Sequence, residues 1–266
     1  MNELLNKKIL ITGASSGIGA GIARAFAQYH TQLILHYNNN YDGVVETQKI
    51  VTQSGSQAKI IQCNFSQQEA LKNFLLEAVE SFSGVDILVN NAGVIPKTSI
   101  TDTDIIAWKN TLAVNLDAPF LLSKHFAEQL IEKQQQGSII NISSIHGEQS
   151  CENFAAYAAS KSALNALTKA QSIEWAKHNI RVNAIAPGVI EVERNRERLQ
   201  KQQDLWAQKI PLGRHGLTSD IAEMAVFLSS DSAAWMTGQV VTIDGGMTVR
   251  GNFPMRNEIS NDTKAS

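Results

Sequence analysis

Short apolar runs that alternate with helical patterns are the feature of this sequence that most restricts its fold. Seven runs have the length and composition of buried strands: residues 8–11, 32–37, 59–63, 86–89, 138–142, 181–185 and 240–243. Helical patterns lie between them, over residues 18–29, 44–52, 67–82, 104–133, 157–177 and 219–228. Such alternation predicts parallel strands, because each helix returns the chain to the same end of the sheet. We therefore expect an α/β fold with a doubly wound, seven-stranded parallel sheet and helices on both faces.

A glycine-rich turn follows the first of these runs. Residues 12–19 read Thr-Gly-Ala-Ser-Ser-Gly-Ile-Gly, and a helical pattern begins within them. Glycines let the backbone turn sharply and approach a phosphate closely, and a helix N-terminus offers unpaired N–H groups and the positive end of a dipole. The order of strand, turn and helix therefore predicts a site for the diphosphate of a dinucleotide. The expected contacts come from Gly13, Ser15, Ser16, Gly17, Ile18 and Gly19.

A tyrosine and a lysine form the second motif. Tyr157 and Lys161 lie four positions apart in a helical pattern, so their side chains share one face of the helix. A phenol has a pKa of about 10, and we expect the ammonium group of Lys161 to lower the pKa of Tyr157, which could then act as an acid or base. Ser144 follows the run 138–142 at the start of a loop, where its hydroxyl is placed to hold a substrate oxygen. By itself the spacing also fits an exposed helix pair.

Together, the two motifs resemble the short-chain dehydrogenases/reductases. The glycine spacing GxxxGxG is similar to the TGxxxGxG turn of that family and differs from the general GxGxxG fingerprint, and the YxxxK pair is similar to the family's catalytic motif. The resemblance runs from about residue 7 to residue 249. It implies a single Rossmann-fold domain, expected over residues 1–253 and followed by a polar tail, residues 254–266. It also implies a catalytic tetrad of Asn115, Ser144, Tyr157 and Lys161.

Further residues match the family's cofactor site. Asn64 stands where the family commonly has an aspartate beside the adenine, and an amide can still make that contact. Val192 is a departure, because the family often has a threonine there that bonds to the nicotinamide carboxamide. Besides the glycine turn, the resemblance assigns cofactor contacts to Tyr37, Asn38, Asn64, Phe65, Asn91, Ala92, Gly93, Tyr157, Lys161, Pro187, Gly188 and Ile190.

The end of the second strand is where the choice between NAD and NADP is expected to be encoded. An acidic side chain there would bond to the ribose hydroxyls of NAD and repel a 2′-phosphate, whereas an arginine would favour the phosphate. Residues 36–40 read His-Tyr-Asn-Asn-Asn, and Ser16 is neutral as well. Because no carboxylate repels the phosphate, and several groups can donate hydrogen bonds to it, we favour NADP(H), with NAD(H) as the alternative.

The resemblance implies hydride transfer between a nicotinamide cofactor and a secondary alcohol or ketone, as in an alcohol dehydrogenase or carbonyl reductase. The loop 145–153 is polar and lies beside Tyr157, which suits a sugar or polyol-like substrate held by Ser144, His146 and Tyr157. The segment 191–208 matches the family's mobile substrate lid. Two alternatives stay open: a 3-oxoacyl thioester reductase, and a dinucleotide-binding sensor or scaffold without catalysis.

Composition and residue spacing restrict the classes of partner that the chain could bind. A net charge of −2 over 266 residues gives no electrostatic basis for binding nucleic acid or an anionic membrane. The sequence has no apolar run long enough for a membrane span and no apolar leader, which predicts a cytoplasmic protein. The histidines and the two cysteines, Cys63 and Cys151, show no metal-ligand spacing, so we expect no metal and two free thiols. Trp235 and residues 238–246 resemble the family's subunit contact, which implies a homotetramer.

Overall fold

The computed structural model describes residues 2–250 and confirms the seven-stranded parallel sheet. The strands are β1 (Lys8–Ile11), β2 (Gln32–Tyr37), β3 (Gln57–Gln62), β4 (Ile87–Asn90), β5 (Gly137–Ile142), β6 (Ile180–Pro187) and β7 (Val240–Ile243). Their order is β3-β2-β1-β4-β5-β6-β7, and every neighbouring pair is parallel. The chain moves outward from β1 to β3 and then returns to β4 on the other side of β1. The strand order therefore reverses between β1 and β4, where doubly wound sheets bind ligands.

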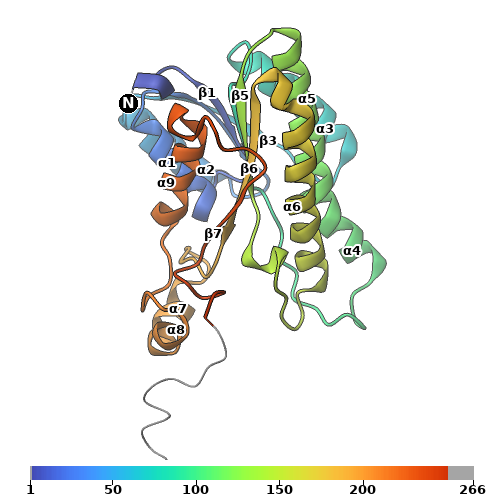
Figure 1. Cartoon of the computed structure of the whole chain (residues 1–266), viewed down its shortest axis with the longest axis vertical. Coiled ribbons are helices and arrows are strands. Elements are labelled where there is room, and N and C mark those ends of the chain that lie inside the picture. Colours follow the sequence, from blue (N-terminus) through green and yellow to red (C-terminus); the bar gives the residue numbers. More distant parts are fainter. Residues whose placement is uncertain (1, 251–266) are drawn as a thin grey trace, which may run out of the picture.

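Helices cover both faces of the sheet (Figure 1). One face packs against α1 (Gly17–Ala27), α2 (Tyr41–Gln53) and α9 (Thr218–Ser229), and the other against α3 (Gln68–Ser81), α5 (Ala118–Glu132) and α6 (Ala155–Trp175). Successive strand residues point to opposite faces, so Ile9 and Ile11 join one buried apolar cluster and Leu10 the other. Burial on both faces explains why the strands read as continuous apolar runs.

The helical region predicted over residues 104–133 is interrupted. It consists of α4 (Ile105–Leu112), a π-helical turn at Ala113–Asp117, and α5. Pro119 has no N–H to donate to the carbonyl of Asn115, so the regular α-helical pattern cannot continue there. The interruption lies next to the candidate site, because Asn115 belongs to the π-helical turn.

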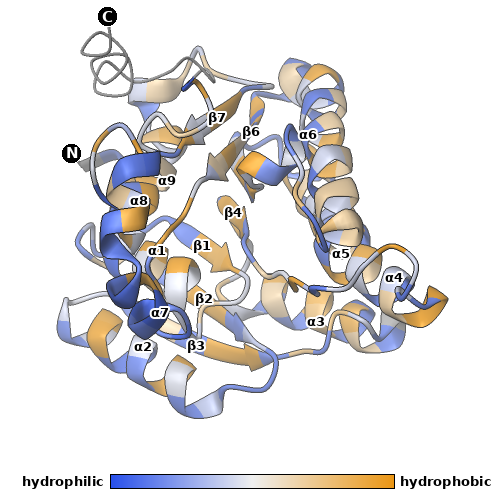
Figure 2. Ribbon diagram, turned by 90° about the horizontal axis from the view of Figure 1, so that it is seen from below, coloured by the Kyte–Doolittle hydropathy of each residue, from blue (hydrophilic) through white to orange (hydrophobic). Residues whose placement is uncertain are grey.

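Two short helices, α7 (Arg196–Lys201) and α8 (Gln203–Lys209), form within the segment predicted as a lid. They lie beyond the carboxyl ends of the strands (Figure 1). Figure 2 shows them on the α1 side of the strand ends, opposite α5 and α6, and the residues of α7 are coloured largely as hydrophilic. The strand ends are thus flanked by α7 and α8 on one side and by α6 on the other.

Several other predictions concern features outside this architecture. The thiols of Cys63, which is buried, and Cys151, which is exposed, are both free, as predicted. Within residues 2–250, no helix has the length and hydropathy needed to cross a membrane. The same part of the chain holds no cluster of three or more His, Cys, Asp or Glu side chains that could bind a metal. The predicted polar tail, residues 254–266, lies outside the described residues.

Candidate active site

The four residues of the predicted tetrad come from three elements that meet at the carboxyl edge of the sheet. Ser144 follows β5, Tyr157 and Lys161 lie on the first two turns of α6, and Asn115 is in the π-helical turn. All four are buried. A Cβ atom added to Gly93, after β4, would lie 3.3 Å from Asn115 Oδ1 and 3.8 Å from Lys161 Nζ. A small residue at position 93 thus keeps the space beside these two polar groups open.

Asn115 fixes the loop after β4 against α6. Its side-chain oxygen accepts a hydrogen bond from the Val94 N–H at 2.8 Å, and its amide nitrogen donates to the Val94 carbonyl at 2.9 Å. The same nitrogen contacts Ser160 Oγ at 3.1 Å. Since the Asn115 side chain is fully buried, these bonds compensate for its lost hydration. The Asn115 amide therefore positions the loop after β4 relative to α6, because all its hydrogen bonds are to Val94 and Ser160.

Lys161 is a buried cation held on the end of β5. Its ammonium group donates to the carbonyl of Ile142 at 2.8 Å and lies 5.8 Å from the centre of the Tyr157 ring. Burial lowers the pKa of Lys161 to about 8, because an apolar environment disfavours the charged form. At neutral pH most molecules still carry the charge at this position.

The pKa of Tyr157 differs from the sequence-based expectation. Burial raises it, and the Ser144 hydroxyl and the positive charge of Arg194 act in the opposite direction with smaller effect. The expected lowering of this pKa by Lys161 is therefore not found in the protein alone, because desolvation of the phenolate outweighs the charges around it. Tyr157 is therefore a protonated phenol, the form that can donate a proton, although the raised pKa makes it a weaker acid.

His146, which the sequence predicts to be a substrate contact, lies beside the tetrad. Its backbone N–H donates to Ser144 Oγ at 3.1 Å, and its ring is 6.2 Å from the Tyr157 ring and 4.9 Å from the Phe154 ring. Burial lowers the pKa of His146, which favours the neutral ring. Its Nδ1 atom is buried and has no hydrogen-bond partner among the described residues. A contact between this ring and the substrate stays a prediction.

The glycine turn has the shape that a diphosphate requires. Gly13 and Gly17 have φ angles of +67° and +55°, in the left-handed region that favours glycine. A Cβ atom at Gly19 would lie 2.2 Å from the Gly13 carbonyl oxygen, so only glycine fits where α1 packs on the turn. Ser15 and Ser16 lie in the same turn and Ile18 in the first turn of α1; Ser16 occupies the N-cap position, but its side chain makes no capping hydrogen bond. These residues fit a dinucleotide phosphate at the N-terminus of α1.

The side chain of Asn91 holds this turn in place. Its amide nitrogen donates to the carbonyls of Thr12 and Gly13 at 2.8 and 3.1 Å. The backbone N–H groups of Asn91 and Ala92 both donate to Thr12 Oγ1 at 2.9 Å. The side chain predicted to contact the cofactor therefore fastens the loop after β4 to the end of β1. Sequence reasoning did not assign a role to Thr12, although it opens the glycine motif.

The predicted residues at the ends of β2 and β3 shape two adjoining turns. Tyr37 ends β2, and the carbonyl of the next residue, Asn38, accepts a hydrogen bond from Gln62 at 3.0 Å. The side-chain oxygen of Asn64 accepts from the N–H and the hydroxyl of Ser66 at 3.1 and 2.8 Å. Phe65 is buried with its ring stacked on His36. Direct cofactor contacts by these residues stay predictions.

The loop after β6 closes over the glycine turn. Pro187 ends β6, and a Cβ at Gly188 would lie 2.6 Å from the Cβ of Asp244, so glycine is needed for the close approach of β7. Ile190 is buried in the core cluster shared with α1. Two residues further, a Val192 methyl would lie 3.1 Å from a Cβ on Gly17.

Glu193 is a contact that sequence reasoning missed. Its carboxylate accepts a hydrogen bond from the Gly17 N–H at 3.0 Å, across 176 positions of the chain. That N–H belongs to the first residue of α1, where the dipole favours an anion. A phosphate that takes this N–H must displace the carboxylate. No local pattern in the sequence could reveal this contact, because the two residues meet only through the fold.

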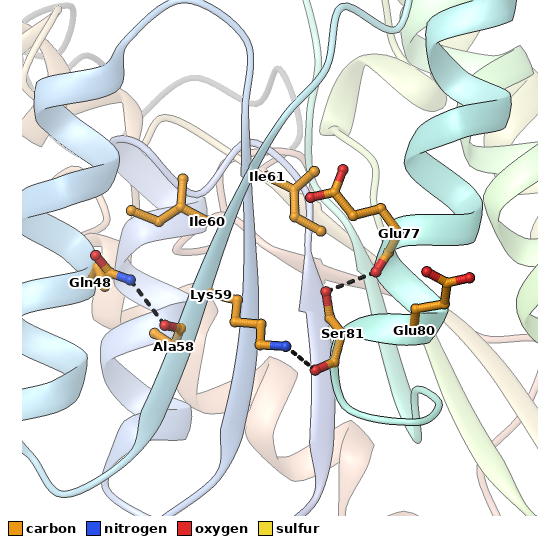
Figure 3. A pocket seen from close by; sticks show the side chains of 8 residues that line it. All are labelled: Gln48, Ala58, Lys59, Ile60, Ile61, Glu77, Glu80 and Ser81. Atoms are coloured by element: carbon orange, nitrogen blue, oxygen red, sulfur yellow. Dashed lines mark hydrogen bonds between the residues drawn. The ribbon is translucent and has the colours of Figure 1, made fainter.

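A separate groove lies at the far edge of the sheet, on the outer strand β3 between α2 and α3. Figure 3 shows its lining: Gln48, Ala58, Lys59, Ile60, Ile61, Glu77, Glu80 and Ser81. Two hydrogen bonds cross it, from Gln48 to the Ala58 carbonyl and from Lys59 to the Ser81 carbonyl. Its lining includes none of the predicted site residues.

Comparisons with known proteins identify the family. A family model described as enoyl-(acyl carrier protein) reductase matches residues 13–248. The chain is 35% identical over 254 residues to 3beta-hydroxysteroid dehydrogenase 1 of Eggerthella lenta, with 95% of this chain and 97% of that protein covered. The chain belongs to the short-chain dehydrogenase/reductase family. Another member, glucose 1-dehydrogenase 2 of Bacillus subtilis, is 30% identical over 249 residues, which cover 93% of this chain and 96% of that protein.

Solved structures of short-chain dehydrogenases/reductases share the fold. Acetoin dehydrogenase from Salmonella typhimurium aligns with a TM-score of 0.85 and 32% identity, covering 93% of this chain and 99% of its own. A candidate 2-deoxy-d-gluconate 3-dehydrogenase from Agrobacterium tumefaciens, with bound NADP, aligns with a TM-score of 0.83 and 34% identity, covering 94% and 100%. The predicted family and Rossmann fold are thereby confirmed.

The buried charge of Lys161 gives a stability that depends on pH. Its pKa of about 8 in the folded protein lies below the ordinary value of 10.5, so the unfolded state binds more protons between these two pH values. The penalty for burying the charge is complete below about pH 8 and disappears as the pH rises toward about 10.5. The stability of wild type relative to a Lys161→Met variant should therefore rise over this interval.

Urea unfolding of both proteins at several pH values across the interval checks this expectation. The variant removes this titration and leaves the other groups in place, so the difference between the two curves isolates Lys161. Parallel curves for wild type and variant would show that the lysine is not held in an environment that disfavours its charge.

Proposed function

We propose that this chain is an NAD(P)-dependent oxidoreductase that transfers hydride between the nicotinamide cofactor and a secondary alcohol or ketone. The observation that carries the proposal is that Tyr157 lies beside both Ser144 and Lys161, with Gly93 next to Lys161, at the same edge of the sheet as a glycine turn that fits a dinucleotide phosphate. Short-chain relatives named as dehydrogenases, one of them with bound NADP, support it. The activity would be that of an alcohol dehydrogenase or carbonyl reductase.

Each side chain has a role that follows from its position. A bound nicotinamide cofactor would supply or accept the hydride. When a ketone is reduced, Tyr157 would donate its phenolic proton to the carbonyl oxygen, and Ser144 would hold the same oxygen by a hydrogen bond. The ammonium group of Lys161 would stabilise the phenolate left behind and bond to the ribose hydroxyls. In the oxidation of an alcohol the same proton moves in the other direction.

NADP(H) is the cofactor we favour, with NAD(H) as the alternative. Tyr37 and Asn38 follow the buried part of β2 and carry no negative charge that would repel a 2′-phosphate. The NADP bound in the Agrobacterium tumefaciens relative supports this choice. Glu193 disfavours the binding of either cofactor, because its carboxylate occupies the Gly17 N–H.

The substrate we propose is polar, such as a sugar or polyol. The His146 ring beside Tyr157 supports a polar substrate atom at this position. Arg194 places a positive charge near the Tyr157 hydroxyl, and Lys97 lies 5.5 Å from the centre of the Phe154 ring. Relatives named for glucose and for deoxygluconate support the same class.

A 3-oxoacyl thioester reductase is the competing enzymatic function. The family model that matches residues 13–248 takes its description from an acyl-carrier-protein reductase. A sensor or scaffold without catalysis would not require an intact tetrad, whereas here all four residues occupy one buried cluster.

We also propose that the enzyme is cytoplasmic and forms a homotetramer. Trp235 is fully exposed in the single chain, and Ile105 and Ile106 on α4 are 63% and 68% exposed. Apolar surface of this kind is typical of an interface between subunits.

Removal of the Tyr157 hydroxyl tests the mechanism. A Tyr157→Phe variant keeps the ring but loses the proton, so turnover should fall by about 100-fold or more, the range of general acid catalysis. The affinity for NADPH, measured by its fluorescence, should change little. A Tyr29→Phe variant, in the turn that follows α1, serves as the matched control and should keep wild-type turnover. Near-normal turnover by Tyr157→Phe would contradict the mechanism.

The substrate for that experiment comes from an absorbance assay at about 340 nm, the band of the reduced nicotinamide. NAD and NADP are paired with sugars, polyols and secondary alcohols, and NADH and NADPH with carbonyl compounds that include an acetoacetyl thioester. Turnover of a sugar or polyol would support the proposed class, and activity confined to the thioester would favour the competing reductase. Tight cofactor binding without any turnover would favour the sensor.

Neutralising Glu193 should strengthen cofactor binding. In a Glu193→Gln variant the Gly17 N–H keeps an acceptor, but the negative charge that competes with the diphosphate is gone. The dissociation constant of NADPH should fall by about two- to fivefold, as expected for an exposed charge. Glu197→Gln makes the same change of charge on α7, where Glu197 pairs with Lys201, and should leave the constant unchanged. Equal effects of both variants would show that the Gly17 contact does not matter.

A further inference from the structure

His36 is a buried polar residue that the proposed mechanism does not use. It is the next-to-last residue of β2, and only 2% of it is exposed. Its ring stacks on Phe65 with 4.0 Å between centres and 6° between planes, and the edge of Phe74 lies against it at 5.1 Å. Burying a polar ring costs free energy unless its nitrogens are hydrogen-bonded, so the partners of His36 indicate its role.

Both ring nitrogens of His36 bind the backbone of other segments. Nδ1 lies 3.0 Å from the Gly13 nitrogen, and because a backbone N–H can only donate, Nδ1 must be the acceptor. The proton of the neutral ring is then on Nε2, which donates to the Cys63 carbonyl at 3.0 Å. Burial lowers the pKa of His36 to about 4, so the ring is neutral at physiological pH and this pairing is stable.

These bonds fix the first glycine of the phosphate turn from both sides. The Gly13 N–H is held by the His36 ring, and the Gly13 carbonyl accepts from the Asn91 side chain at 3.1 Å. The next N–H, of Ala14, donates to the His36 carbonyl at 2.8 Å. Two successive peptide groups of the turn are thus held by one residue of β2, and the other nitrogen of its ring holds the end of β3 through Cys63.

We propose, on the basis of the proposed function, that His36 is a positioning residue of the dinucleotide site. Its ring joins the glycine turn after β1 to the segment after β3, and so sets the geometry in which the N–H groups of the turn receive the cofactor phosphates. A turn that is already ordered loses less conformational entropy when the cofactor binds. His36 therefore contributes to cofactor affinity without touching the cofactor.

If His36 had only a structural role, its variants would lose stability, and their affinity for the cofactor would fall only in proportion to that loss. A buried ring in the cluster with Phe65 and Phe74 also stabilises the fold, so a loss of stability alone proves nothing. The distinguishing readout is the dissociation constant of the cofactor compared with the free energy of unfolding, across variants that separate the Gly13 bond from the packing.

Four variants make this separation. His36→Phe keeps a ring stacked on Phe65 but loses both hydrogen bonds. His36→Asn can place an oxygen near the position of Nδ1 and restore the acceptor for Gly13, whereas His36→Gln can place its amide nitrogen near Nε2 and restore only the Cys63 bond. Phe74→Leu is the control, because it loosens the same core cluster and leaves the bonds of His36 intact.

The dissociation constants of NADPH and NADH are measured by fluorescence titration, and the stability of each variant by urea unfolding. We expect His36→Phe and His36→Gln to weaken binding about fivefold to tenfold, which corresponds to one hydrogen bond of about 1 kcal/mol. His36→Asn should recover affinity to within about threefold of wild type, and Phe74→Leu should bind normally despite its lower stability.

Two results would overturn the proposal. Normal cofactor affinity in both His36→Phe and His36→Gln would show that the Gly13 bond is not needed. Affinity that falls in step with stability in all four variants, Phe74→Leu included, would leave His36 a structural role only. If His36→Phe does not fold, the comparison of the Asn and Gln variants decides between the two roles. Failure of the wild-type protein to bind either cofactor would instead contradict the proposed function.

Discussion

The parallel pairing of β1 with both β2 and β4 is the constraint on which the rest of the structure depends. The chain builds outward to β3 and restarts at β4 on the other side of β1, so the loops after β1 and β4 diverge over the same edge of the sheet. Both faces of these strands are buried under helices, which leaves the carboxyl edge as the place where polar chemistry can gather. The glycine turn, Gly93, Ser144 and the loop after β6 all lie there.

Hydrogen bonds between distant segments hold this edge. Thr12 joins β1 to the loop after β4, Asn115 joins that loop to α6, and His36 joins the glycine turn to the end of β3. In each case a side chain binds backbone groups that no strand pairing would satisfy, and burial makes an unpaired group costly. Residues that do not react thus determine where Tyr157 and Lys161 stand relative to the phosphate turn.

Much of this could be predicted from the sequence, because the strands and the two motifs are local patterns. The apolar runs predicted the strands of the sheet. The position of Ser144 directly after one of these runs was sufficient to predict that it lies near Tyr157. Features that arise where segments distant in the sequence approach each other could not be predicted. The raised pKa of Tyr157 depends on how completely the fold buries the ring, and the bond from Gly17 to Glu193 spans 176 positions. The π-helical turn at Asn115 had a local cause in Pro119, which could have been found.

A crystal structure of the protein with bound NADPH would show whether the glycine turn and the tetrad form one site. We expect the diphosphate against the N-terminus of α1, with the Glu193 carboxylate displaced from Gly17, and the nicotinamide ring beside Tyr157 and Lys161. A cofactor bound with its nicotinamide away from Tyr157, or in the groove along β3, would show that they do not.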